Sequence, residues 1–297
     1  MQFVLLSVQL VIGLVIRLDP VKRVARYRSL GVKMARRAEL SKYALESVDR
    51  MAAVLQSLES APEHPLEQVA RMTGLNESTA LRYLLSLSRH GFVERDDDTG
   101  LFRLGLGLFR LGTLAMDSRD ILSLADPVMA NLQAQFGESV NLAAYQQDKV
   151  VLIRVLGRPD SMRKEGKVGE TDPWHATSLG KAILAALPQD EVNDILMGIT
   201  LQGYTPNTKT NLTDLTRELN STRQQGYSVD DEEVVEGLRC VGVAIRGHKG
   251  RVQYALSLSG PKSRMTYSRI QEIGTVLVQS ADLLSAKLGA TVRTATR

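Results

Sequence analysis

The sequence predicts a mixed α/β (α+β) protein with two domains, a winged helix-turn-helix near the N-terminus and a larger α/β domain behind it. Three short helical patterns are followed by two short strand patterns, which is the element order of a winged helix-turn-helix. Strand and helix patterns then interleave over the rest of the chain. The length of 297 residues is sufficient for two domains that each bury a core.

The first 43 residues are expected to form an extension outside both domains. Phe3 to Leu18 is almost wholly apolar, but it is short for a bilayer-spanning helix, which needs roughly twenty such residues. Residues 17–42 then carry nine Lys or Arg against two acids, so the basic net charge of +4 originates here. A membrane anchor, a structural extension and a start codon assigned too early are the alternatives. We favour translation from near Met34, or a disordered basic arm, over an anchor.

Apolar residues at helical spacing predict three short helices in the first domain. The buried positions are expected to be Val48, Met51, Leu55 and Leu58 in the first, Leu66, Val69 and Ala70 in the second, and Ala80, Leu84 and Leu87 in the third. Gly74 provides the tight turn before the third helix, and Asn76 is a suitable N-cap. Residues 92–95 and 101–104 flank an Asp/Gly turn, which predicts a β-hairpin.

The third helix carries the residues expected to contact DNA. Ser78 and Thr79 lie at its N-terminus, where hydroxyl and backbone N–H groups hold phosphate, and Arg82 is placed to donate two hydrogen bonds to a guanine edge. Tyr83 either packs inside or reaches the DNA backbone. Residues 45–104 contain ten acids and six arginines, which is weak electrostatics for a DNA-binding module unless a dimer and the basic arm compensate. A protein-interaction module remains the alternative.

The remaining chain is expected to begin with an apolar connecting helix and to continue as an α/β domain. Strands are expected at 140–142, 150–156, 240–246 and 251–259, and helices at 179–187 and 212–225 and near the C-terminus. In the last strand, Ser257 and Ser259 alternate with Val252, Tyr254, Leu256 and Leu258. The hydroxyl-bearing side either lines a polar cavity or faces solvent.

Enzyme signatures are absent or incomplete, so no enzyme and no cofactor is expected. Ser178 and Lys181 match the Ser-x-x-Lys of serine acyl-enzymes, but the companion motifs are missing. Gly180-Lys181 lacks the remainder of a P-loop. The four histidines have no metal-ligand spacing, and the single Cys240 is expected to be a buried small residue, which suits a reducing, cytoplasmic setting.

Several motifs, in the right order over residues 44–290, resemble the IclR family of bacterial transcription regulators. They are Glu46 to Arg50, Leu66 to Leu75, Ser78 to Leu84, the wing signature Phe102-Arg103-Leu104-Gly105, His175 to Ala182, Gly226 to Glu233, Glu236 to Val241 and Leu256 to Pro261. The resemblance implies a winged-helix domain, a linker helix and a GAF-like effector-binding domain. It adds Arg103 to the residues expected at DNA.

The resemblance also implies an effector pocket, carried over by motif position to Ser178, Leu179, Asp230, Leu238, Cys240, Ser257 and Ser259. Free N–H groups at Ser178 and Leu179 would suit a carboxylate. Asp230 would repel an anion unless it is protonated or accepts a hydrogen bond from a ligand hydroxyl. Trp174 suggests a stacking surface, and Arg163, Lys164 and Lys167 either add positive charge near the pocket or lie in solvent.

The protein is expected to be a ligand-responsive transcription regulator of a catabolic operon. It is expected to bind palindromic double-stranded operator DNA and to sense a small organic acid or aromatic metabolite. Self-association as a dimer or tetramer is expected, and a membrane partner is not. The expected boundaries are 1–43 for the extension, 44–105 for the DNA-binding domain, 106–120 for the linker helix, 121–290 for the effector-binding domain and 291–297 for a tail. The alternative is a small-molecule sensor whose helical module binds a protein.

Overall fold

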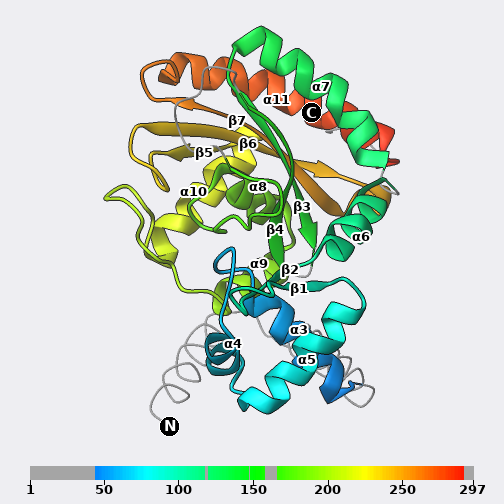
Figure 1. Ribbon diagram of the computed structural model, residues 1–297. Helices are drawn as coiled ribbons and strands as arrows, with labels where there is room; N and C mark the ends of the chain where they lie inside the picture. Colours follow the sequence, from blue (N-terminus) through cyan, green and yellow to red (C-terminus); the bar gives the residue numbers. More distant parts are fainter. Residues whose placement is uncertain (1–43, 118–119, 147, 158–165, 291–297) are drawn as a thin grey trace. The chain divides into compact units, whose positions relative to one another are not determined.

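The structure, a computed structural model, describes residues 44–117, 120–146, 148–157 and 166–290 (Figure 1). The chain divides between Met116 and Asp117 into two compact units. The expected start near Met34, the apolar segment, the basic arm and the pair Arg163 and Lys164 lie outside the described residues.

The first unit has the predicted order of three helices, a hairpin and a further helix. Its elements are α3 (Glu46–Ser57), α4 (Leu66–Thr73), α5 (Glu77–Arg89), β1 (Val93–Arg95), β2 (Phe102–Leu104) and α6 (Leu106–Asp117). Gly74 ends α4 with a φ of 67°, the left-handed conformation predicted for it. The Asn76 side chain caps α5 by accepting a hydrogen bond from the N–H of Thr79 at 2.9 Å.

A small apolar core holds the first unit together. Its buried members are Val54, Leu58, Val69, Leu84, Leu87, Val93 and Phe102. One predicted core residue is wrong, because Val48 is 49% exposed. The buried face of α3 includes Val54 instead, which lies three and four residues from Met51 and Leu58 and turns the face away from Val48.

The hairpin is the predicted wing, with β1 and β2 antiparallel and Val93 opposite Leu104. At its tip the Asp96 carboxylate accepts hydrogen bonds from the backbone N–H of Asp98 at 3.1 Å and of Thr99 at 2.8 Å. His64 forms an isolated antiparallel bridge with Phe102, which extends the small sheet by one position. The first acid of the Asp run therefore builds the turn.

The second unit is an α/β domain with one antiparallel sheet. Its elements are α7 (Asp120–Phe136), β3 (Ser139–Gln146), β4 (Lys149–Leu156), α8 (Ser178–Ala186), α9 (Gln189–Met197), α10 (Leu212–Gln225), β5 (Ser228–Asp231), β6 (Leu238–Arg246), the 3-10 turn η1 (His248–Gly250), β7 (Val252–Pro261) and α11 (Tyr267–Lys287). The strand order is β4-β3-β7-β6-β5. Among the helices that the structure describes, none is both long and apolar enough to cross a bilayer.

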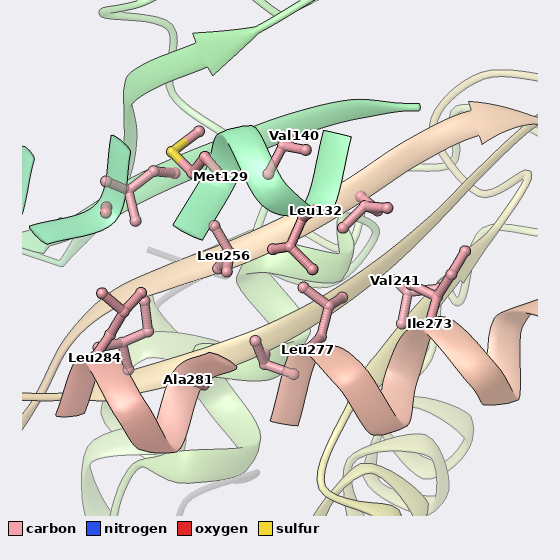
Figure 2. Packing of buried hydrophobic residues seen from close by; sticks show 14 of the residues in the cluster. Met129, Leu132, Val140, Val241, Leu256, Ile273, Leu277, Ala281 and Leu284 are labelled. Carbon is pink, nitrogen blue, oxygen red and sulfur yellow. The ribbon is translucent and has the colours of Figure 1, made fainter. Parts of the chain in front are cut away.

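Helices cover both faces of this sheet. On one face, residues of α7 and α11 pack against Val140, Val241 and Leu256 of the strands (Figure 2). On the other face, α8 contacts β5, β6 and β7. A second apolar cluster there joins the sheet to α8, α9 and α10. Burial on both faces leaves the polar residues of the α8 face inside the domain.

The predicted alternation along β7 holds from Tyr254 onward but fails at Val252. Tyr254, Leu256 and Leu258 pack with α7 and α11, whereas Val252 packs in the cluster on the α8 face. The reason is a β-bulge, because Ile245 pairs with Tyr254 and the next residue, Arg246, pairs with Val252. The extra residue reverses the side to which the start of the strand points.

Candidate functional site

The exposed side of α5 presents two of the residues predicted to contact DNA, Ser78 and Arg82, whereas Thr79 on the same helix is half-buried. Ser78, Arg82, Ser86 and Arg89 are exposed and lie four, four and three residues apart, so they share one face of the helix. The Ser78 hydroxyl donates to the Asn76 side chain at 2.9 Å. This face therefore presents the Ser78 hydroxyl at the helix N-terminus and two guanidinium groups beyond it.

The two predicted guanidinium contacts differ in their surroundings. Arg82 makes no ion pair or hydrogen bond through its side chain within the described part of the chain. Arg103 on β2 instead donates to Glu94 at 3.1 Å and to Glu63 at 3.3 Å, and these bonds raise its pKa further. The charge of Arg103 is thus already balanced, and that of Arg82 is free. Tyr83 packs at the edge of the core.

In the second unit, strand pairing places most of the predicted pocket residues in adjacent rows on one face of the sheet. One row contains Asp230, Cys240 and Ser259, which pair in register across β5, β6 and β7. The next row contains Ser228, Gly242, Ser257 and Asn141. Leu238, half-buried, begins the same face of β6 two residues before Cys240.

The first turn of α8 lies directly over these rows. A Cβ atom on Gly242 would come within 2.7 Å of the Ser178 backbone, and the Ser228 hydroxyl donates to the Ser178 carbonyl at 2.6 Å. Thr177 caps the helix by accepting from the N–H of Gly180 at 3.0 Å. The N–H groups of Ser178 and Leu179 have no partner within the described residues. The structure therefore brings the predicted α8 and strand residues together.

The side chain of Leu179 is placed differently from that of its neighbour Ser178. The Leu179 side chain is buried in the apolar cluster of the α8 face, among residues of α9 and α10. Only its backbone N–H remains available to a ligand. Trp174, predicted as a stacking surface, is also part of that core: its ring meets Tyr145 edge-on at 5.5 Å between centroids, and its indole N–H donates to the Asp148 carbonyl.

Burial dominates the electrostatics of the site. It raises the pKa of Asp230 to about 7, although the Glu233 N–H donates to that carboxylate at 2.7 Å and opposes the shift. Burial and the nearby Glu170 charge raise the pKa of Asp172 to about 7 as well. Burial, then the charge of Asp230, raises the pKa of the Cys240 thiol. Near neutral pH the site therefore contains carboxyl groups that are readily protonated.

Sequence reasoning missed two residues of this site. The Asn141 side chain donates to Ser259 at 3.0 Å. Asn141 is the third residue of β3 and stands between Val140 and Leu142, so an amide between apolar residues was a signal that could have marked it. Asp172 affects the Cys240 thiol electrostatically and stands in an irregular segment just before Pro173. No motif or periodicity marks that segment.

Two family models match the chain. The model described as IclR helix-turn-helix domain matches residues 47–97, and the one described as bacterial transcriptional regulator IclR C-terminal matches residues 113–286. The two matches fall on the helix–hairpin unit and on the α/β unit.

Individual proteins are similar over most of their length. The HTH-type transcriptional repressor AllR of Escherichia coli is 36% identical over 245 residues, which are 82% of this chain and 90% of AllR. The crystal structure of the Thermotoga maritima IclR covers 83% of this chain and all of its own, with 29% identity and a TM-score of 0.62. An IclR homolog from Microbacterium hydrocarbonoxydans, complexed with 4-hydroxybenzoate, has 25% identity and a TM-score of 0.67 over 81% of this chain and 98% of its own.

Proposed function

Since the chain belongs to the IclR family of bacterial transcriptional regulators, we propose the residues through which it binds operator DNA and a small-molecule effector. Like its relatives it is a DNA-binding transcriptional repressor with an effector-binding domain, and not an enzyme. We assign DNA binding to residues 44–105, a linker that contains α6 to 106–120 and effector binding to 121–290.

The exposed face of α5 is the proposed DNA-reading surface. Ser78 and Thr79 bind phosphate at the helix N-terminus, and Arg82 reads a base edge in the major groove. The observation that carries this proposal is the unpaired Arg82 guanidinium on a helix whose opposite face is buried. Arg103 reaches a phosphate only by giving up Glu94 or Glu63, so we give it a lesser part.

Replacing Arg82 by Ala tests this surface. Loss of a bidentate base contact is expected to weaken specific operator binding by about 1–3 kcal/mol. The measurement is a gel-shift titration on the DNA upstream of the protein's own gene, with competitor DNA and at two salt concentrations. Arg50→Ala is the matched control, because it removes the same charge from α3, where Arg50 pairs with Glu46.

The result also separates DNA recognition from the protein-binding alternative. Wild-type binding that is no stronger than competitor binding would assign the helical unit to a protein partner. Equal losses in Arg82→Ala and Arg50→Ala would reduce the role of Arg82 to its charge alone.

The rows of β5, β6 and β7 beneath the first turn of α8 are the proposed effector site. Asp230, Cys240, Ser257 and Ser259 supply its floor, and the free N–H groups of Ser178 and Leu179 receive an acidic group of the ligand. The ligand class is a small organic acid or aromatic metabolite. Support comes from the 4-hydroxybenzoate complex of the Microbacterium relative and from the hydroxyl-rich floor beneath unpaired N–H groups.

Self-association belongs to the same proposal. The helix α6 exposes Leu106 and Phe109, each 74% accessible, together with Leu111 and Leu114. An exposed apolar helix of this kind marks a protein interface more often than a solvated surface. A dimer or tetramer supplies two recognition helices to a palindromic operator. We place the protein in the bacterial cytoplasm, where it controls a catabolic operon.

A further inference from the structure

A buried cluster of charges lies behind the proposed effector site. Lys181 on α8 is 0% exposed, and its ammonium contacts the carboxylates of Glu233, 1% exposed, and of Glu218 on α10. Lys209 approaches the same two carboxylates at 3.7 and 3.9 Å. Lys181 and Glu233 are therefore a buried pair, and the partly exposed Glu218 and Lys209 extend the cluster towards the surface.

Burying charged side chains in this way is unfavourable in free energy. Removing a charge from water is unfavourable, and apolar residues of similar size frequently replace a buried ion pair without loss of stability. Burial lowers the pKa of Lys181, but the charges of Glu218 and Glu233 outweigh it and raise that pKa, so the ammonium stays charged. What the cluster provides beyond packing is a fixed relative position of the segments that it joins.

The segments that the cluster joins are α8 and β5, which form two sides of the proposed effector site. Lys181 stands one turn after Ser178 on α8, and its ammonium also donates to the Val229 carbonyl, next to Asp230 on β5. Glu233 donates its backbone N–H to the Asp230 carboxylate at 2.7 Å. The first turn of α8 and the Asp230 side chain are thus attached to a single ion pair.

The turn that carries Glu233 is also held by hydrogen bonds from the loop between α9 and α10. The Thr208 hydroxyl donates to the Glu233 carbonyl at 2.6 Å, and the Thr205 hydroxyl donates to the Glu232 carbonyl at 2.7 Å. Asn207 donates to the Asp231 carbonyl at 3.0 Å. The loop between α9 and α10 therefore holds the turn that follows β5.

We propose that Lys181 and Glu233 are positioning residues of the effector site, which hold Asp230 against Cys240 and keep the first turn of α8 above them. Neither side chain contacts the ligand in this role. The pair fixes the spacing between the N–H groups of α8 and the row Asp230, Cys240, Ser259. An effector that moves Asp230 or α8 must disturb the Lys181–Glu233 pair. Because α10 and the loop before it are bonded to this pair and its turn, they are expected to move with it.

Cys240 provides a reporter that needs no effector. It is the single cysteine of the chain and is buried beside Asp230, so its rate of reaction with a maleimide rises when this part of the site opens. Full-length Glu233→Gln and Lys181→Met are expected to accelerate labelling by about tenfold or more, measured by mass spectrometry at a fixed interval below each melting temperature. The matched control is Glu138→Gln, which disturbs another buried carboxylate, paired with Arg264 beside α11.

A double variant keeps the test decisive if the single variants fold poorly. Lys181→Met with Glu233→Met removes both charges together and is expected to recover most of the stability while Cys240 remains rapidly labelled. Wild-type protection of Cys240 in the double variant overturns the proposal, as does equal acceleration in Glu138→Gln. The proposal rests on the proposed effector site, yet labelling uses neither ligand nor DNA. A wrong ligand site would leave the labelling pattern unchanged, and a wrong positioning role would leave ligand binding unchanged.

Discussion

Asp230 is a buried carboxyl group, and its burial disfavours the charged form. The side chain is 3% exposed, and its pKa is raised from 3.8 to about 7. The folded protein therefore retains a proton that the unfolded chain releases above pH 3.8. The contribution of this proton to the free energy of unfolding is complete below that pH and is lost as pH rises to about 7.

Asp230→Asn is expected to remove this pH dependence, because the amide has the same shape and stays neutral. The variant should be more stable than the wild type by about 1–3 kcal/mol at pH 8 and nearly equal to it at pH 4. Urea unfolding at both pH values measures the difference. Parallel pH profiles of the two proteins would show that Asp230 is ionised throughout.

Single residues were predicted well where a local rule decides them. Asn76 caps α5 and Gly74 adopts a positive φ because both depend on neighbours in the sequence. The two acids that bind Arg103 are nine and forty residues away, so no sequence pattern shows that its charge is balanced. For the same reason the sequence did not indicate that Lys181 is buried among carboxylates.

At the scale of elements, β6 and the start of α8 approach each other through their backbones. Gly242 lies beneath Ser178, and a Cβ atom there would stand 2.7 Å from the Ser178 carbonyl carbon and oxygen. Since the obstacle is backbone, it cannot rotate away as a flexible side chain does. The absence of a side chain at residue 242 allows the start of α8 to reach the sheet.

Gly242→Ala should therefore push α8 from the sheet and lower the free energy of unfolding of the second unit by about 1–3 kcal/mol. Gly198→Ala is the control, because its Cβ would meet nothing nearer than 3.5 Å and its backbone is right-handed. Thermal unfolding compares the two variants. Equal melting temperatures would show that α8 adjusts to a methyl group at this point.

Periodicity and turn residues predicted the bounds of α10 and its end at Gly226 correctly, but they did not indicate α7, α9 or β5, and they gave only part of β3. They did not indicate the β-bulge before Val252 either, because a bulge depends on pairing with the neighbouring strand and leaves no mark on the alternation itself. Nor could alternation decide whether Ser257 faces a cavity or solvent. The structure excludes solvent, because Ser257 is buried, and its burial depends on the contact between the sheet and α8, which joins residues distant in the sequence.

For the whole molecule, the exposed apolar side of α6 predicts self-association. Leu114→Asp places a charge on this side and should lower the mass measured by sedimentation equilibrium towards the 32.7 kDa of one chain. Operator binding should weaken by about tenfold or more, because each recognition helix then binds its half-site alone. Leu212→Asp, at an exposed leucine of α10, is the control. An unchanged mass in Leu114→Asp would assign α6 to another use.

The alternation of the sheet also bears on how regulators of this kind diversify. Val241, Leu256 and Leu258 belong to the apolar core with α7 and α11, whereas their neighbours Cys240, Ser257 and Ser259 point to the opposite face. At the proposed effector site, a mutation at one of the latter three would alter the chemistry offered to a ligand without changing a residue of that core. On this proposal, successive mutations at these three positions would redirect the protein to a new metabolite while the apolar core and the DNA-binding unit keep their residues.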